Sequence, residues 1–176
     1  MRKNMEIRKS QIKDFDRIKY LYDSAREYFK KIGIDQWQKG YPSDKMIEAD
    51  ILNGESFVCL IDGKIIAVFM SAKKKDPSYE SIYDGWWRLD EDYVVLHRVA
   101  VDEEYKGHGI GGQIVEFVEK TFCPTGKGYI KADTHENNYA MQKMLVKSGF
   151  KKAGIIRLAE GSEKRAKRVA FDKILK

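Results

Sequence analysis

The residues best suited to chemistry lie in a glycine-rich segment with four glycines in six positions, whose full sequence is Lys106, Gly107, His108, Gly109, Ile110, Gly111 and Gly112. An apolar, β-branched run precedes this segment and a helical pattern follows it. Its backbone N–H groups can therefore converge at the positive end of a helix dipole. Glycine permits positive φ and lets phosphate oxygens approach the backbone closely. The segment is predicted to bind a phosphate-bearing ligand, with Lys106 adding a positive charge.

Two other interpretations of the glycines remain open. The segment also fits the dinucleotide pattern G-x-G-x-x-G, with Asp133 about 20 residues further on. Against it, five residues separate Val101 from Gly107, and only 43 residues follow Asp133, too few for a doubly wound sheet. The glycines could also form only a tight turn, at a high conformational cost. A Walker-type phosphate loop is excluded, because Gly-Lys-Ser and Gly-Lys-Thr do not occur.

The rest of the chain supplies the elements that must position this segment. Apolar or alternating runs predict strands at 5–9, 57–61, 65–71, 93–101, 129–133, 150–158 and 169–174. Helical spacing predicts helices at 12–29, 43–53, 110–118 and 141–149. Asp62-Gly63 is the pair that a tight hairpin turn prefers. The order of elements predicts an α/β (mixed α+β) fold, a mixed, mostly antiparallel sheet with helices on its faces.

Together, these features resemble the GNAT superfamily of N-acetyltransferases. The family's pyrophosphate signature, Arg/Gln-x-x-Gly-x-Gly/Ala, is similar to Lys106–Gly111, with Lys in place of the usual first residue. The strand before it resembles the family's acetyl-CoA strand, and Asn138 opening a helix that ends at Gly149-Phe150 resembles its second signature. The resemblance implies a sheet of about seven strands with about four helices. It also implies acetyl-CoA contacts at Val99, Ala100, Val101, Lys106, Gly107, His108, Gly109, Ile110, Gly111, Gly112, Asn138 and Met141.

One position departs from the family pattern. Many members place a tyrosine seven residues after the asparagine, where its hydroxyl can protonate the leaving thiolate, but this chain has Leu145. Either another group, such as Tyr139 or a water molecule, protonates the sulfur, or the thiolate leaves without help. The departure also leaves open a non-catalytic acyl-CoA-binding module.

His97 is the first candidate for a catalytic base. By strand alternation it lies on the same face as Val99 and Val101, and imidazole titrates near neutral pH. A hydrogen-bonded core histidine is the competing interpretation. Backbone N–H groups near Val99 could bond the thioester oxygen. His108 is expected to be a solvent-facing spacer and His135 a loop or cap residue.

Aromatic residues gather in two irregular segments, which by resemblance would flank the acceptor site: Trp37, Tyr41, Trp86 and Trp87. The first of these segments is expected to expose its aromatic rings. Flat ring faces can hold an amine or a cation, although packing is the commoner use.

Composition narrows the class of protein. A chain of 176 residues with 43% hydrophobic and 34% charged residues predicts a single globular domain over 1–176. The net charge of +6 comes from scattered lysines and arginines without a reader motif, so no nucleic-acid partner is expected. No apolar stretch is long enough to span a bilayer, and Met1 to Arg8 carry charges instead of a signal-peptide core. The lack of a spanning stretch and of such a core favours a cytoplasmic protein. Cys59 and Cys123 lack metal-ligand spacing, and a disulfide between them is not expected.

The sequence therefore predicts an N-acetyltransferase that moves an acetyl group from acetyl-CoA to a primary amine. The acceptor, a small molecule, an amino-acid derivative, a peptide or a protein, is not specified by the residues. No metal and no membrane are expected to take part, and the subunits are expected to form a homodimer. The alternatives are the non-catalytic acyl-CoA-binding module and a nicotinamide dinucleotide-binding domain, which would prefer NAD to CoA.

Overall fold

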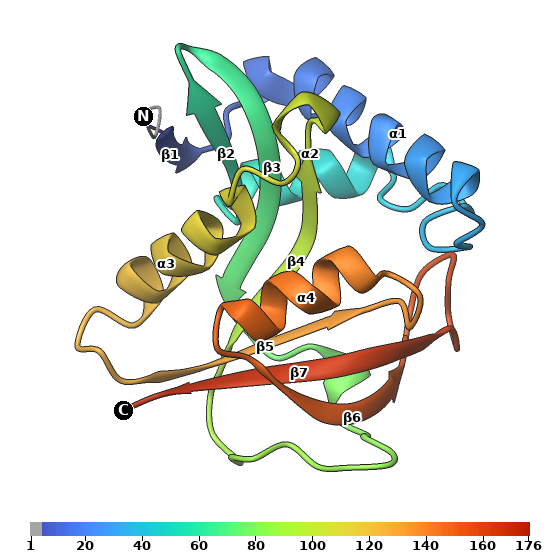
Figure 1. Cartoon of the computed structure of the whole chain (residues 1–176), viewed down its shortest axis with the longest axis vertical. Helices are drawn as coiled ribbons and strands as arrows, with labels where there is room; N and C mark the ends of the chain where they lie inside the picture. Colours follow the sequence, from blue (N-terminus) through green and yellow to red (C-terminus); the bar gives the residue numbers. More distant parts are fainter. Residues whose placement is uncertain (1–4) are drawn as a thin grey trace. The chain divides into compact units, whose positions relative to one another are not determined.

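The computed structural model describes residues 5–176, so Met1–Asn4 of the predicted domain lie outside the described residues. Figure 1 shows the elements in chain order: β1 (Met5–Lys9), α1 (Phe15–Lys31), α2 (Asp44–Leu52), β2 (Ser56–Ile61), β3 (Lys64–Lys73), β4 (Val94–Val101), α3 (Ile110–Phe122), β5 (Gly128–Thr134), α4 (Tyr139–Lys147), β6 (Lys151–Arg157) and β7 (Lys167–Leu175). Within a few residues, these are the strands and helices that the sequence predicts.

The strands follow the order β1-β2-β3-β4-β5-β7-β6 in a seven-stranded sheet. Strands β4 and β5 are parallel, in register over Val94–Leu96, while β1 with β2, β2 with β3, β5 with β7 and β6 with β7 are antiparallel. The predicted mixed, mostly antiparallel α/β fold is thus confirmed. Asp62 and Gly63 both have positive φ, 50° and 78°, as the predicted tight hairpin turn requires.

Contacts group the described chain into two compact units, 5–71 with 97–114 and 72–96 with 115–176. The boundary falls inside β4, after Leu96, so the candidate residues from His97 to Val101 belong to the first unit. The organisation into one domain stays a prediction.

In the first unit, the core lies between the two N-terminal helices and the strands beside them (Figure 1). Ile18 and Leu21 of α1 and Ile47 of α2 pack in one cluster with Val58 of β2 and Val68 of β3. All five side chains are buried, as the helical and alternating patterns predict. This packing fixes the ends of α1 and α2, and therefore the segment that joins them.

In the second unit, β7 lies between β5 and β6, and α4 packs on β6. Asp172 of β7 is fully buried, and the hydroxyl of Tyr129 and the guanidinium of Arg88 both donate to its carboxylate, at 2.6 Å each. A buried carboxylate needs such partners, because an unpaired charge in the interior is very costly. Arg88 thereby ties the irregular segment 74–93 to the sheet.

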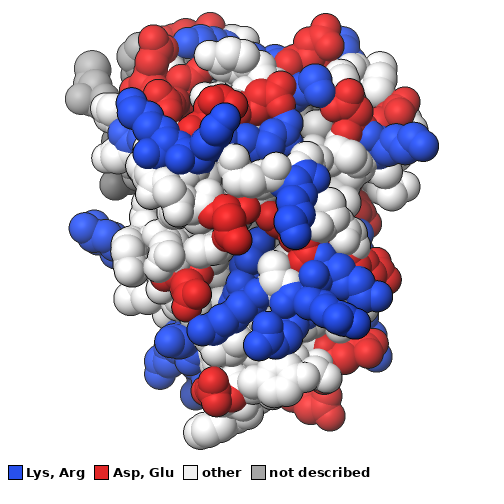
Figure 2. All heavy atoms as spheres, turned by 90° about the vertical axis from the view of Figure 1, so that its right-hand side faces the viewer, with Lys and Arg blue, Asp and Glu red and all other residues white. Residues whose placement is uncertain are grey.

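The surface carries charges of both signs. Figure 2 shows a face on which Lys and Arg side chains gather in one area, with Asp and Glu around it. Several basic side chains pair with acids, among them Lys19 with Asp44 and Lys64 with Glu104. The expected absence of a nucleic-acid partner stays a prediction.

Candidate functional site

The glycines of the segment differ in what the backbone requires of them. Gly107 and Gly109 have φ of 80° and 77°, which other residues rarely adopt. Gly112 lies within α3 without a positive φ, and a Cβ atom built on it meets nothing within 4 Å. A glycine in a helix costs about 1 kcal/mol relative to alanine. The backbone at Gly112 is thus open to solvent on this side.

The segment also has the electrostatics of an anion site. Helix α3 begins at Ile110, and the first N–H groups of a helix have no partner within it and form its positive end. The ammonium of Lys106 lies 3.6 Å from the centroid of the Tyr28 ring and 3.9 Å from the Glu103 carboxylate. Partial burial lowers the pKa of Lys106. His108 is exposed, as expected of a spacer.

Strand β4 departs from regular strand geometry at Arg98, whose φ is 52°. Its neighbours His97 and Val99 are both half-buried. A residue with positive φ interrupts the alternation of side chains, as in a β-bulge. The alternation used to place His97 and Val99 on one face therefore does not extend across Arg98, and the role of His97 stays a prediction.

Arg98 is itself a residue that sequence reasoning missed. Its guanidinium makes a two-point ion pair with Asp50 of α2, at 2.8 and 2.9 Å, and donates to the hydroxyl of Tyr41 at 2.7 Å. The side chains of Arg98 and Asp50 are each 10% exposed. Burial lowers the pKa of Arg98, but Tyr41 and Asp50 outweigh it and raise that pKa above its ordinary value. Asp50 within a helical pattern gave no signal of this pairing.

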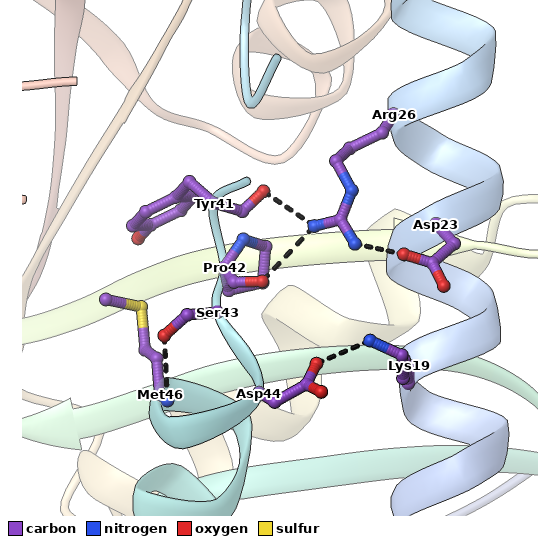
Figure 3. Close-up of polar contacts among 8 residues, drawn as sticks. All are labelled: Lys19, Asp23, Arg26, Tyr41, Pro42, Ser43, Asp44 and Met46. Carbon is purple, nitrogen blue, oxygen red and sulfur yellow. Dashed lines mark hydrogen bonds and ion pairs between the residues drawn. The ribbon is translucent and has the colours of Figure 1, made fainter. Parts of the chain in front are cut away.

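The segment between α1 and α2 is fastened at several points, which Figure 3 shows. Arg26 donates to the carbonyl oxygens of Tyr41 and Pro42, at 2.9 and 3.2 Å, and is held by Asp23. At the start of α2, the ammonium of Lys19 lies 2.5 Å from the Asp44 carboxylate. The position of this segment is thus set by α1.

The first irregular segment does not expose its aromatic rings as expected. Trp37 is only 5% exposed, and its ring contacts those of Tyr22, Phe29 and Tyr41, with centroids 5.5 to 6.0 Å away. The expectation of exposed rings was wrong because the segment folds back onto α1, where a large apolar ring gains more from burial. Trp86, in the second segment, is 73% exposed.

In the second unit, Asn138 caps α4, since its side chain accepts from the N–H of Met141 at 3.2 Å. The predicted opening of this helix by Asn138 is confirmed; the contacts of Asn138 and Met141 with the cofactor stay a prediction. Leu145 is fully buried, so the position of the family's tyrosine is part of the core. Tyr139 is 71% exposed, and His135 accepts from the N–H of Asn137 as a loop residue.

The second unit also holds a buried lysine that the sequence did not reveal. The ammonium of Lys131 lies 4.2, 4.0 and 5.3 Å from the ring centroids of Trp87, Tyr93 and Tyr129. Lys131 as a whole is only 5% exposed. Burial lowers the pKa of Lys131 to about 8, while Asp172 opposes the shift. The sequence predicted a short strand at 129–133 and assigned no role to Lys131.

Across residues 5–176, no group of three or more His, Cys, Asp or Glu side chains has the arrangement of a metal site. No helix in this part of the chain is long and apolar enough to cross a membrane.

Comparisons with known proteins identify the class. The model of the acetyltransferase (GNAT) family matches residues 18–150. A GNAT-family acetyltransferase of Streptococcus agalactiae, known from its crystal structure, is 31% identical over 98% of this chain and 96% of its own, with a TM-score of 0.84. The chain belongs to the GNAT family of acyl-CoA-dependent acetyltransferases. None of the curated proteins matches it.

Two further solved structures share the fold at lower identity. A GNAT-family acetyltransferase of Listeria monocytogenes is 22% identical over 97% of this chain and 95% of its own, with a TM-score of 0.71. The PaiA N-acetyltransferase of Thermoplasma acidophilum, solved with coenzyme A, is 17% identical over 97% and 99%, with a TM-score of 0.68. Both likenesses concern the fold alone.

Proposed function

We propose that this chain transfers the acetyl group of acetyl-CoA to a primary amine of a small molecule, an amino-acid derivative or a peptide. The observation that carries the proposal is Gly112, a helical glycine with open space in front of it at the positive end of α3. A backbone left bare at a helix N-terminus suits a pyrophosphate. The segment from Lys106 to Gly112 would hold the pyrophosphate of CoA, and Val99, Ala100, Val101, Asn138 and Met141 its pantetheine arm.

Acetyl-CoA brings the activated acyl thioester, and the chain supplies position and proton transfer. In the proposed reaction, the amine nitrogen forms a bond to the acyl carbon and the bond from that carbon to sulfur breaks. The N–H of Val99 donates to the acyl oxygen, and His97 accepts the proton of the amine. Leu145 has no proton to give, so the thiolate takes its proton from water or from the exposed hydroxyl of Tyr139, or it leaves without help.

Turnover with a panel of amines tests this proposal. The protein is incubated with acetyl-CoA and with polyamines, amino acids and short peptides bearing free N-termini, and acetylated products are detected by mass spectrometry together with released thiol. The proposal predicts a product with at least one class of primary amine. Binding of acetyl-CoA without any product over the whole panel would contradict it.

That contrary result is the prediction of the second candidate, a non-catalytic acyl-CoA-binding module. The observation in its favour is Leu145, a buried apolar residue where many family members carry a tyrosine. Thiol release separates the two, since the module would bind acetyl-CoA and release no thiol with any amine of the panel, whereas the transferase would release it with at least one.

Two further points belong to the proposal. We infer a cytoplasmic location, which the two free, buried cysteines favour, because disulfides are rare there. We also infer a homodimer, for which the exposed ring of Trp86 offers an apolar contact. Fractionation and light scattering, respectively, test these inferences.

A further inference from the structure

Arg98 has a backbone conformation that its own chemistry does not favour. Its φ of 52° lies in the left-handed region, which a Cβ atom makes unfavourable. Arg98 lies within strand β4. The other non-glycine residues with positive φ in the described part of the chain lie in turns or loops: Trp37, Asp62, Asp84 and Arg165. Such a conformation persists only where surrounding contacts hold it.

The contacts that hold it come from outside the strand. Asp50 of α2 accepts from two guanidinium nitrogens, and the Tyr41 hydroxyl accepts from the third. Both side chains are 10% exposed, and breaking an ion pair between two such buried groups is strongly unfavourable. Tyr41 is fixed in turn, because Arg26 binds its carbonyl oxygen at 2.9 Å (Figure 3). The side chain of Arg98 is therefore anchored to α2 and to the segment before it.

This anchor acts on the peptide group that the proposed reaction uses. The conformation of residue 98 turns the following peptide, whose N–H belongs to Val99, away from the direction it would have in a regular strand. We propose that Arg98 is a positioning residue: its anchor to Asp50 and Tyr41 holds β4 in the bulged conformation that aims the Val99 N–H at the acyl oxygen of acetyl-CoA. This inference rests on the proposed function.

Two double variants isolate the backbone effect. Asp50→Asn with Arg98→Gly and Asp50→Asn with Arg98→Ala both lack the ion pair, and they differ only in the Cβ atom at position 98. Glycine adopts positive φ without strain and alanine does not. Asp50→Asn with Arg98→Asn is a third variant, since asparagine tolerates this conformation better than other residues with a Cβ atom. It keeps the series informative if the alanine variant does not fold.

The readout is the ratio of the CoA dissociation constant to that of acetyl-CoA, measured by calorimetry. Free CoA has no acyl oxygen, so this ratio reports on the bond to that oxygen and not on general stability. A net hydrogen bond predicts a wild-type ratio of about three or more. We expect the glycine variant to keep it, the asparagine variant to lie between, and the alanine variant to fall to about one.

Other results are equally decisive. Equal ratios in the glycine and alanine variants, whether kept or lost, would overturn the inference, because the backbone conformation would then not matter. A wild-type ratio of one would overturn it too, since no bond to the acyl oxygen would exist. Binding of neither ligand by the wild type would refute the proposed function itself, and the inference with it.

Discussion

Two single residues, Gly112 and His97, carry most of the proposed binding and chemistry. Gly112 has room for a side chain in the fold but not in a complex in which a pyrophosphate touches the backbone. His97 adjoins the anchored Arg98 in β4, close in sequence to Val99. The proposed function gives Gly112 a role in binding and His97 a role in turnover, so the two residues can be tested separately.

Gly112→Ala should have opposite effects on stability and on binding. Alanine favours the helix over glycine by about 1 kcal/mol, and nothing obstructs its Cβ, so the free energy of unfolding should rise. The affinity for CoA should fall about tenfold or more, because the methyl group occupies the space that the ligand needs. Urea unfolding and calorimetry measure the two effects. The control is Glu116→Ala, an exposed change in the same helix, which should leave the affinity for CoA unaltered. An unchanged affinity in Gly112→Ala would contradict the proposed pyrophosphate site.

His97→Ala should lower turnover without weakening CoA binding. A positioned general base contributes about 100-fold or more to rate, and the proposed contact of His97 is with the amine, not with CoA. Steady-state kinetics with an accepted amine, together with calorimetry of CoA, make the comparison. Full turnover in the variant across the pH range would remove His97 from the mechanism.

At the scale of elements, the two irregular segments differ in how they are held. The segment between α1 and α2 has its aromatic ring inside the core and its carbonyl groups bound by Arg26. The segment 74–93 is tied through Arg88 to Asp172 and packs Trp87 and Tyr93 around Lys131. Both segments are therefore held by side-chain contacts, and loss of these contacts should lower the free energy of unfolding.

Trp37→Ala and Trp86→Ala form a matched pair that tests the first segment. Removal of a buried tryptophan costs about 3 to 5 kcal/mol, because both apolar contacts and packing are lost. Trp86 is 73% exposed, so its removal should change the free energy of unfolding by less than about 0.5 kcal/mol. Chemical denaturation of both variants measures this. Equal losses in the two would show that Trp37 does not anchor the segment.

Lys131 predicts a dependence of stability on pH. Its pKa in the folded protein, about 8, lies below the value of about 10.4 for an unfolded chain. Between these values the folded state binds fewer protons than the unfolded state, so the free energy of unfolding should rise with pH, by about 1 to 2 kcal/mol from pH 8 to 9.5. The stability is lost again as pH falls toward 8.

Lys131→Met provides the comparison, since it has a similar shape and no titrating group. Unfolding of both proteins in urea across this range isolates the contribution of the lysine from those of other groups. The wild-type curve should rise relative to that of the variant. Parallel curves would mean that Lys131 keeps its ordinary pKa among the three rings.

At the scale of the whole molecule, the order of elements was readable from the sequence, but several contacts were not. Periodicity and turn pairs such as Asp62-Gly63 predicted the strands and helices, because local spacing decides which face of an element is apolar. The family signatures indicated the glycine segment and Asn138. The Arg98–Asp50 pair and the cluster around Lys131 join residues far apart in the chain, and single-sequence patterns carry no signal of such pairing. The conformation of Arg98 likewise depends on contacts outside its strand.

A thermal-shift titration with acetyl-CoA, CoA and NAD side by side tests whether the glycine segment binds CoA. A ligand at 100 times its dissociation constant stabilises the folded protein by about 2.7 kcal/mol, enough for a clear rise in melting temperature. The account predicts a rise with acetyl-CoA and CoA and none with NAD. A rise with NAD alone, or with none of the three, would contradict it.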